Sequence, residues 1–147
     1  MKVLLQKVTE ASVAVDGEII GQIGKGYVLF IGIIRGDTSA QAALLAEKIA
    51  KLRLFDSESG KINDNSIVDI KGEILVVSQF TLAGSTKKGN RPDYSAAEAP
   101  SDAMILYEYF VRKLSEYDVL TVKTGEFGAY MDVSLINDGP VTLVLDR

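Results

Sequence analysis

The 147-residue sequence contains no cysteine, no histidine and no tryptophan. Without cysteine, the chain can form no disulfide and supplies no thiolate nucleophile. Without histidine, it has no imidazole general base, so neither a Ser-His-Asp nor a Cys-His constellation can be assembled from it. Any hydrolysis must use carboxylates, lysines, hydroxyls, backbone dipoles or groups of the substrate, and we expect neither a metal nor a cofactor.

Long apolar runs and a positive net charge are missing too. The longest apolar run, residues 27–34, has the length of a buried strand and is far shorter than the roughly 20 residues of a membrane span. Charge returns at Lys7, too early for a signal peptide, so we expect a cytoplasmic protein without a membrane partner. A net charge of −4 argues against a broad basic face, and therefore against DNA, but it permits a local contact with one end of an RNA.

Apolar periodicity predicts strands around two separated helices. A hairpin within 3–23 turns at Asp16-Gly17, and a helix over Ser39–Leu52 begins at a capping box of Thr38 and Gln41. Further strands are predicted over 27–34, 73–80, 119–124, 130–136 and 141–145, and a second helix begins at Pro100 with Met104, Tyr107, Val111 and Leu114 on one face. This order predicts an α+β fold over residues 1–147: a single compact domain whose mixed or antiparallel β-sheets form a barrel-like core with two main helices.

Two polar segments could carry chemistry, and each also has a plain structural interpretation. Ser78-Gln79-Phe80-Thr81 ends an apolar strand, where hydroxyls and an amide could bind a ligand or could simply satisfy neighbouring backbone. The loop that follows places Lys87, Lys88 and Arg91 within five residues, which suits either an anion site or a solvated loop.

A third segment, Asn137-Asp138-Gly139-Pro140-Val141-Thr142, lies between two predicted strands. A Gly-Pro pair in this position is typical of a turn. The missing N–H of Pro140 must be tolerated beside a strand, and about 5–6% of X–Pro bonds are cis. A cis bond would direct the flanking carbonyls unusually, toward an amino group for example, but spacing alone leaves both geometries open.

These segments, taken in order, resemble the D-aminoacyl-tRNA deacylases nearly end to end. The matching stretches are Gln6-Lys7-Val8 with Ala11-Ser12-Val13, Leu52–Asp56 with Gly60-Lys61, Ser78–Leu82, Lys88–Pro92, Gly125–Ala129 and Asn137–Thr142. The resemblance implies hydrolysis of the ester between a D-amino acid and the 3′-terminal adenosine of tRNA, and also of glycyl-tRNA mischarged on tRNA(Ala). It implies a homodimer with active sites at the subunit interface, where a cis Gly139-Pro140 motif enters the partner's pocket and rejects L side chains.

The same resemblance assigns site residues. It places catalysis at Thr81, Gln79 and Phe80, and substrate binding at Gly139, Pro140, Ser78 and Met131. For tRNA binding, the local positive charge in an acidic chain makes Lys87, Lys88 and Arg91 the candidates. Lys7 stands where the family usually has an Arg thought to brace the Gly-Pro segment, and Lys lacks the planar fork of that side chain.

The catalytic step is open between two routes. Thr81 could form an acyl-enzyme, which needs an activating base, or the substrate's ribose 2′-OH could assist water while backbone N–H groups near Phe80 and Thr81 bind the oxyanion. The absent histidine favours the second route. A general esterase using Thr81, or a module that binds D-amino acids or an RNA end without turnover, are the rival functions.

Overall fold

A computed structural model describes all 147 residues and contains one six-stranded sheet, one small sheet and two α-helices. The elements follow one another as β1 (Lys2–Val15), β2 (Glu18–Ile23), β3 (Gly26–Gly32), α1 (Ser39–Lys51), β4 (Arg53–Phe55), β5 (Asn65–Ser66), β6 (Glu73–Ser78), the 3-10 turn η1 (Phe80–Ala83), α2 (Pro100–Ser115), β7 (Thr121–Thr124) and β8 (Asp132–Asp146). The predicted α+β fold is confirmed.

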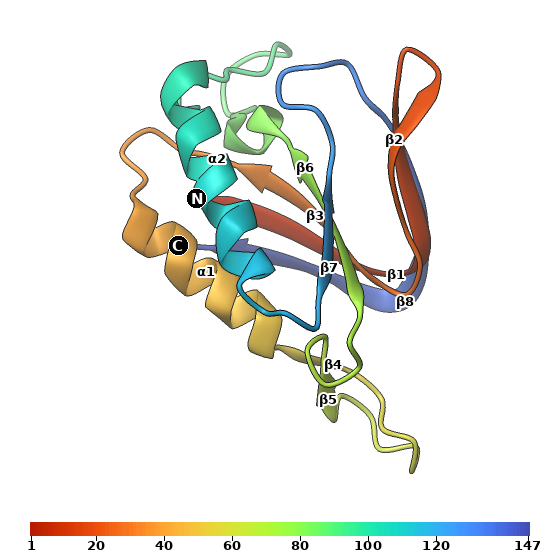
Figure 1. Ribbon diagram of the computed structural model, residues 1–147. Helices are drawn as coiled ribbons and strands as arrows, with labels where there is room; N and C mark the ends of the chain where they lie inside the picture. Colours follow the sequence, from red (N-terminus) through yellow and green to blue (C-terminus); the bar gives the residue numbers. More distant parts are fainter.

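The large sheet is mixed and strongly curved. β1 pairs antiparallel with β2, β3 and β8, whereas β6 runs parallel to both β3 and β7. β8 has β1 as its one neighbour, so its other edge is unpaired. The sheet curls until it is nearly closed into a barrel, and α1 and α2 cover one side of it (Figure 1). Neither helix has the length and apolar content that crossing a membrane requires.

Both faces of the central strands are buried, which explains why their sequences are apolar without alternation. On β3, Tyr27, Leu29 and Ile31 belong to the large core under the helices, while Val28 belongs to a second core inside the curl. β6 divides in the same way, with Ile74 and Val76 on one face and Leu75 and Val77 on the other.

The first helix follows the prediction. Thr38 and Gln41 form the capping box, and the buried side of α1 includes Leu45 and Ile49. At the hairpin, Asp16 and Gly17 both have positive φ, as a type I′ turn requires.

The second helix differs in phase from the prediction. Its buried residues are Ala103, Tyr107, Phe110 and Leu114, whereas Met104 is 43% exposed and Val111 only partly buried. The prediction missed Phe110 because several large apolar side chains of α2 lie outside the core face.

Two predicted strand bounds were also wrong, and one pair of short strands was missed. The strand predicted over 73–80 ends at Ser78, and Phe80 begins η1. β7 begins at Thr121 rather than at Val119, and the short pair β4–β5 was not predicted.

The predicted turn between two C-terminal strands is the largest correction. Residues 132–146 form one strand, and Val8–Asn137 and Gln6–Thr142 are successive partners in its pairing with β1. Between these pairs, residues 138–141 of β8 lie opposite the single residue Lys7. The Gly-Pro pair is therefore a bulge that interrupts a continuous strand, not a reversal of the chain.

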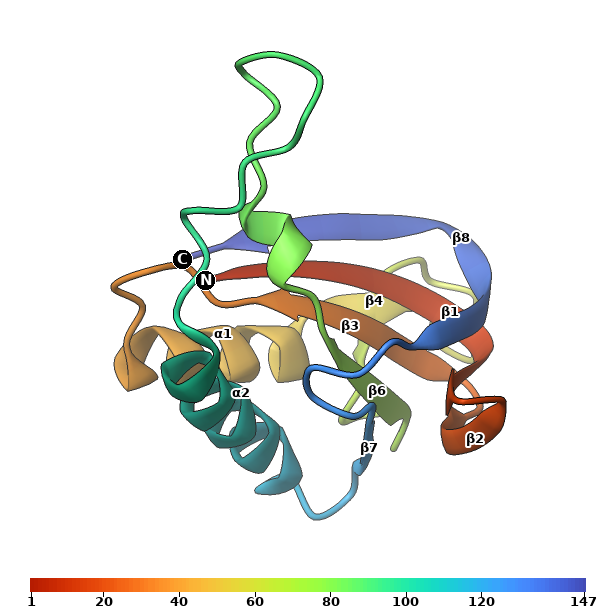
Figure 2. The same cartoon turned by 90° about the horizontal axis from the view of Figure 1, so that it is seen from above.

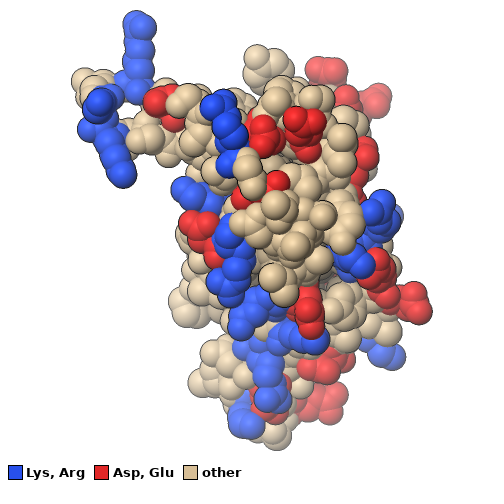
Figure 3. Space-filling view, turned by 90° about the vertical axis from the view of Figure 1, so that its left-hand side faces the viewer, with Lys and Arg blue, Asp and Glu red and all other residues tan.

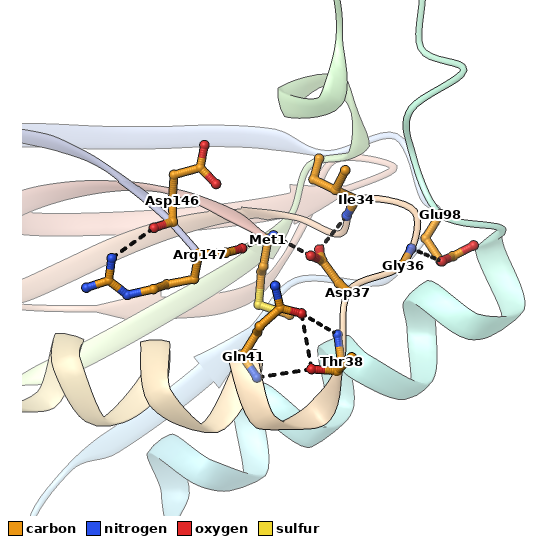
Figure 4. Close-up of polar contacts among 9 residues, drawn as sticks. All are labelled: Met1, Ile34, Gly36, Asp37, Thr38, Gln41, Glu98, Asp146 and Arg147. Atoms are coloured by element: carbon orange, nitrogen blue, oxygen red, sulfur yellow. Dashed lines mark hydrogen bonds and ion pairs between the residues drawn. The ribbon is translucent and has the colours of Figure 1, made fainter.

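A polar cluster joins both ends of the chain to the segment between β3 and α1 (Figure 4). The Met1 amino group lies 2.6 Å from Asp37 Oδ1 and 2.7 Å from the Arg147 carbonyl oxygen, and Asp37 Oδ2 accepts the Ile34 N–H. On the same segment, Gly36 donates its N–H to Glu98, just before α2. These bonds fix the loop that borders the candidate site.

Candidate functional site

A cavity of about 630 Å³ opens where β6 ends. Its walls come from the carboxyl ends of β3 and β6, from the start of α2 and from the connection between β7 and β8, which passes over the end of β6 in Figure 1. Twelve of its 17 lining residues are hydrophobic. A largely apolar cavity with a few polar groups at one wall is the usual form of a small-molecule site.

The polar wall is the segment predicted from the sequence. Ser78, Gln79 and Phe80 line the cavity, and the Gln79 N–H donates to the Ile31 carbonyl at 2.7 Å, which holds the segment against β3. Gly32 allows this contact, because a Cβ there would lie 2.9 Å from the Gln79 carbonyl oxygen.

Thr81 lies just behind this wall. It does not line the cavity, and its hydroxyl accepts a hydrogen bond from the Gln79 side-chain amide. Phe80 and Thr81 open η1, and the first N–H groups of such a turn have no partner within it. No side chain caps this end, so these amides can bind an oxyanion.

Gly139 and Pro140 lie outside the cavity of their own chain. Their peptide bond is cis, both residues are exposed, and a Cβ at Gly139 would meet no atom within 4 Å. Met131, by contrast, lines the cavity.

Two side chains hold the bulge. Asn137 Nδ2 donates to the carbonyls of Lys7 and Val141 at 2.8 and 3.1 Å, so one amide spans the bulge. Lys7 is 9% exposed, and its Nζ lies 3.2 Å from Asp138 Oδ2 and 3.2 Å from the Leu54 carbonyl oxygen. The lysine thus braces the residue next to Gly139 without the fork of an arginine.

The three predicted tRNA-binding cations lie on an exposed loop between η1 and α2. Lys87, Lys88 and Arg91 do not line the cavity. The loop projects away from the body in Figure 2, and Lys and Arg side chains occupy the end of the projecting arm at the upper left of Figure 3. The cations therefore lie outside the cavity, where a contact with tRNA would be separate from any contact made inside the cavity.

Two titratable side chains in the cavity wall, Glu98 and Tyr107, have shifted pKa values. The Gly36 and Ala99 N–H groups donate to Glu98 and hold the pKa of its carboxyl below the ordinary value. Burial raises the pKa of the Tyr107 phenol, which stays neutral and donates to the Val76 carbonyl at 2.9 Å. Tyr107 consequently offers no base.

Sequence reasoning assigned no role to several lining residues. Phe127 packs on Tyr107 at 5.6 Å between ring centroids, Tyr130 is 99% exposed at the mouth, and Glu98 joins two loops. Phe127 belongs to a stretch that carried the resemblance, which was a usable signal, whereas nothing local marked Glu98 or Tyr130. No group of three or more potential metal-ligating side chains occurs in the structure.

Known proteins resemble the chain over nearly its whole length. The family model described as D-Tyr-tRNA(Tyr) deacylase matches residues 4–146. The chain is 54% identical to the D-aminoacyl-tRNA deacylase of a Nitratiruptor species over 99% of this chain and 97% of that protein. It is 53% identical to the D-aminoacyl-tRNA deacylase of Bacillus cytotoxicus over 99% of each.

Two solved structures share the fold. One, titled c-Myc DNA Unwinding Element Binding Protein, has a TM-score of 0.93 at 43% identity and covers 100% of this chain and 99% of its own. The other, titled as a probable eukaryotic D-amino acid tRNA deacylase, has a TM-score of 0.87 at 18% identity and covers 99% and 98%.

Proposed function

The chain belongs to the D-Tyr-tRNA(Tyr) deacylase family, and from that premise we propose that it hydrolyses the ester between a D-amino acid and the 3′-terminal adenosine of tRNA. The observation that carries this proposal is the cavity at the end of β6, with Ser78, Gln79 and Phe80 at its polar wall. Its volume of about 630 Å³ is ample for a nucleoside and part of an aminoacyl group.

Chirality is selected by Gly139 and Pro140 of the partner subunit. In one chain these residues lie outside their own cavity and are exposed. The strand that carries them, β8, has one unpaired edge, and its Ile136 and Val144 side chains are 55% and 73% exposed. Exposed apolar side chains on a free strand edge support a second copy of the chain as the partner that covers this surface. A wall of this kind excludes an L side chain by contact and accepts glycine, which has none, so glycyl-tRNA mischarged on tRNA(Ala) is a second substrate.

The substrate's ribose 2′-OH assists the attacking water. Thr81 has the Gln79 amide as its hydroxyl partner, and an amide is too weak a base in either orientation to activate a nucleophile. The N–H groups of Phe80 and Thr81 stabilise the oxyanion, which suits an ester that is already activated.

The loop of Lys87, Lys88 and Arg91 contacts tRNA phosphates. Three exposed cations in a chain of net charge −4 suit a local contact, not the continuous basic face that duplex DNA requires. The DNA-binding title of one structural relative therefore has no counterpart in the charge of this chain.

The test compares hydrolysis of matched D- and L-tyrosyl-tRNA by the wild type and by Thr81→Ala. We expect selective release of D-tyrosine by both proteins, because the hydroxyl of Thr81 is not the nucleophile. Equal D and L rates would point to a general esterase, and binding without turnover to a capture module. Near-complete loss in Thr81→Ala, with its melting temperature unchanged, would identify an acyl-enzyme route.

A further inference from the structure

Two aromatic rings connect the cavity to the cation loop. Phe80 lines the cavity and is 60% exposed, and Tyr94 is 38% exposed. Their ring centroids lie 5.3 Å apart with an interplanar angle of 73°. Tyr94 also lies on the backbone of Gly84, where a Cβ would come within 2.8 Å of the tyrosine ring. The tyrosine is thus held in place while part of its ring stays accessible.

The position of Tyr94 is fixed by the neck of the loop. Ser85 and Asp93 exchange two backbone hydrogen bonds of 2.8 and 2.9 Å, and Tyr94 is the next residue after this bridge. Lys87, Lys88 and Arg91 lie within the loop that the bridge closes. Along the surface the order is therefore cavity, Phe80, Tyr94, neck and cations.

We infer that Tyr94 is a stacking subsite for the unpaired nucleotide that precedes the terminal adenosine of tRNA. The inference rests on the proposed function, since it assumes that the adenosine occupies the cavity. Single-stranded nucleic acid is held by aromatic rings that stack on bases, next to cations that follow the phosphates. Phe80, Tyr94 and the loop offer that combination in the order that a strand leaving the cavity would meet.

Tyr130 is the competing ring at the mouth, and its surroundings carry the wrong charge. It is 99% exposed and lines the cavity. In the connecting segment 125–131, however, the one charged side chain is the exposed carboxylate of Glu126, and the exposed Asp132 follows at the start of β8. The loop beside Tyr94 carries three cations and one carboxylate, that of Asp93, which accepts the Ser95 N–H. Phosphates are therefore drawn toward Tyr94 and repelled from Tyr130.

The experiment uses two substrates that differ in the nucleotide at issue. D-tyrosyl-tRNA carries it, and D-tyrosyl-adenosine does not. We expect Tyr94→Leu to lower kcat/KM for D-tyrosyl-tRNA by about tenfold, the value of one base–aromatic stack, and to leave D-tyrosyl-adenosine unchanged. Tyr94→Phe keeps the ring and should match the wild type on both.

Other outcomes overturn the inference. An equal loss on both substrates would mean that Tyr94 only positions Phe80. If Tyr130→Ser, and not Tyr94→Leu, lowered kcat/KM for D-tyrosyl-tRNA alone, the 3′ end of the tRNA would leave the cavity over Tyr130. Calorimetric titration with the trinucleotide CpCpA and with adenosine decides the point without turnover, since Tyr94→Leu should weaken CpCpA binding alone. If the wild type hydrolyses neither ester, the proposed function fails, while the titration still tests the subsite.

Discussion

Lys7 is the residue through which the body of the protein holds the Gly139-Pro140 bulge. Its Nζ contacts Asp138 Oδ2 and the Leu54 carbonyl oxygen, each at 3.2 Å. We expect Lys7→Met, which keeps most of the length of the side chain and removes its charge, to lower the free energy of unfolding by about 1–2 kcal/mol. Because Asp138 then loses its partner, discrimination of D- from L-tyrosyl-tRNA should fall as well. Urea unfolding and paired rate measurements check the two effects.

The conservative variant separates bracing from stability. Lys7→Arg keeps the positive charge opposite Asp138 and should retain wild-type selectivity. If Lys7→Met loses stability but keeps full selectivity, the ion pair does not brace the selector, and Asn137 alone must hold the bulge.

Individual residues differ in how far local sequence predicts their place. Ser78 ends an apolar strand and Gln79 and Phe80 follow it directly, so their common position at a sheet end was predictable from chain order. Tyr94 and Tyr130 lie in connections, where no periodicity tells which ring faces the cavity and which faces solvent. Their environment depends on segments that are distant in the sequence, and only the structure supplies it.

Among the elements, the start of α2 is joined to the loop before α1 by Glu98. Its carboxylate accepts the N–H groups of Gly36 and Ala99, which keeps its pKa in the folded protein below the ordinary 4.5. The stabilisation from these two hydrogen bonds is therefore fully present above about pH 4.5, the ordinary pKa, and is lost as pH falls through the lower pKa of the folded state. We expect the unfolding free energy of the wild type to fall more steeply between about pH 5 and pH 3 than that of Glu98→Gln.

Glu58→Gln is the matched control for this measurement. Glu58 is exposed in the turn after β4 and makes no hydrogen bond or ion pair. Its variant should follow the acid-induced loss of the wild type. If the unfolding free energies of wild type and Glu98→Gln fell in parallel with pH, the charge of Glu98 would contribute nothing to stability.

The C-terminal strand shows why an element can escape a local prediction. Asn-Asp-Gly-Pro is a strong turn signal in isolation, yet pairing with β1 on both sides of the bulge keeps residues 132–146 in one strand. The phase of α2 was misjudged for a related reason: Met104 and Ile105 are large and apolar but exposed, so composition alone does not mark the core face. In α1 the capping box and periodicity agreed, and the prediction was right.

At the scale of the whole molecule, the proposed selector, Gly139 with Pro140, is separated from the cavity of its own chain. Gly139 and Pro140 are exposed on a strand with a free edge, away from the cavity lining. Selection in a dimer then works in trans, which mixing two variants can detect. One variant carries Gly139→Ala with Pro140→Ala and keeps an open cavity. The other, Ala129→Trp, fills its cavity and keeps the selector.

The first variant alone should hydrolyse L-tyrosyl-tRNA, because no wall excludes the L side chain. After unfolding and refolding in equal mixture, half of its cavities face an intact selector from the second variant. The L rate per open cavity should therefore fall to about half if chains pair at random in a two-fold dimer. Sedimentation velocity on the same mixture establishes the dimer. An unchanged L rate in a sedimenting dimer would mean that each chain selects for itself, and a monomer at working concentration would remove the partner from the mechanism.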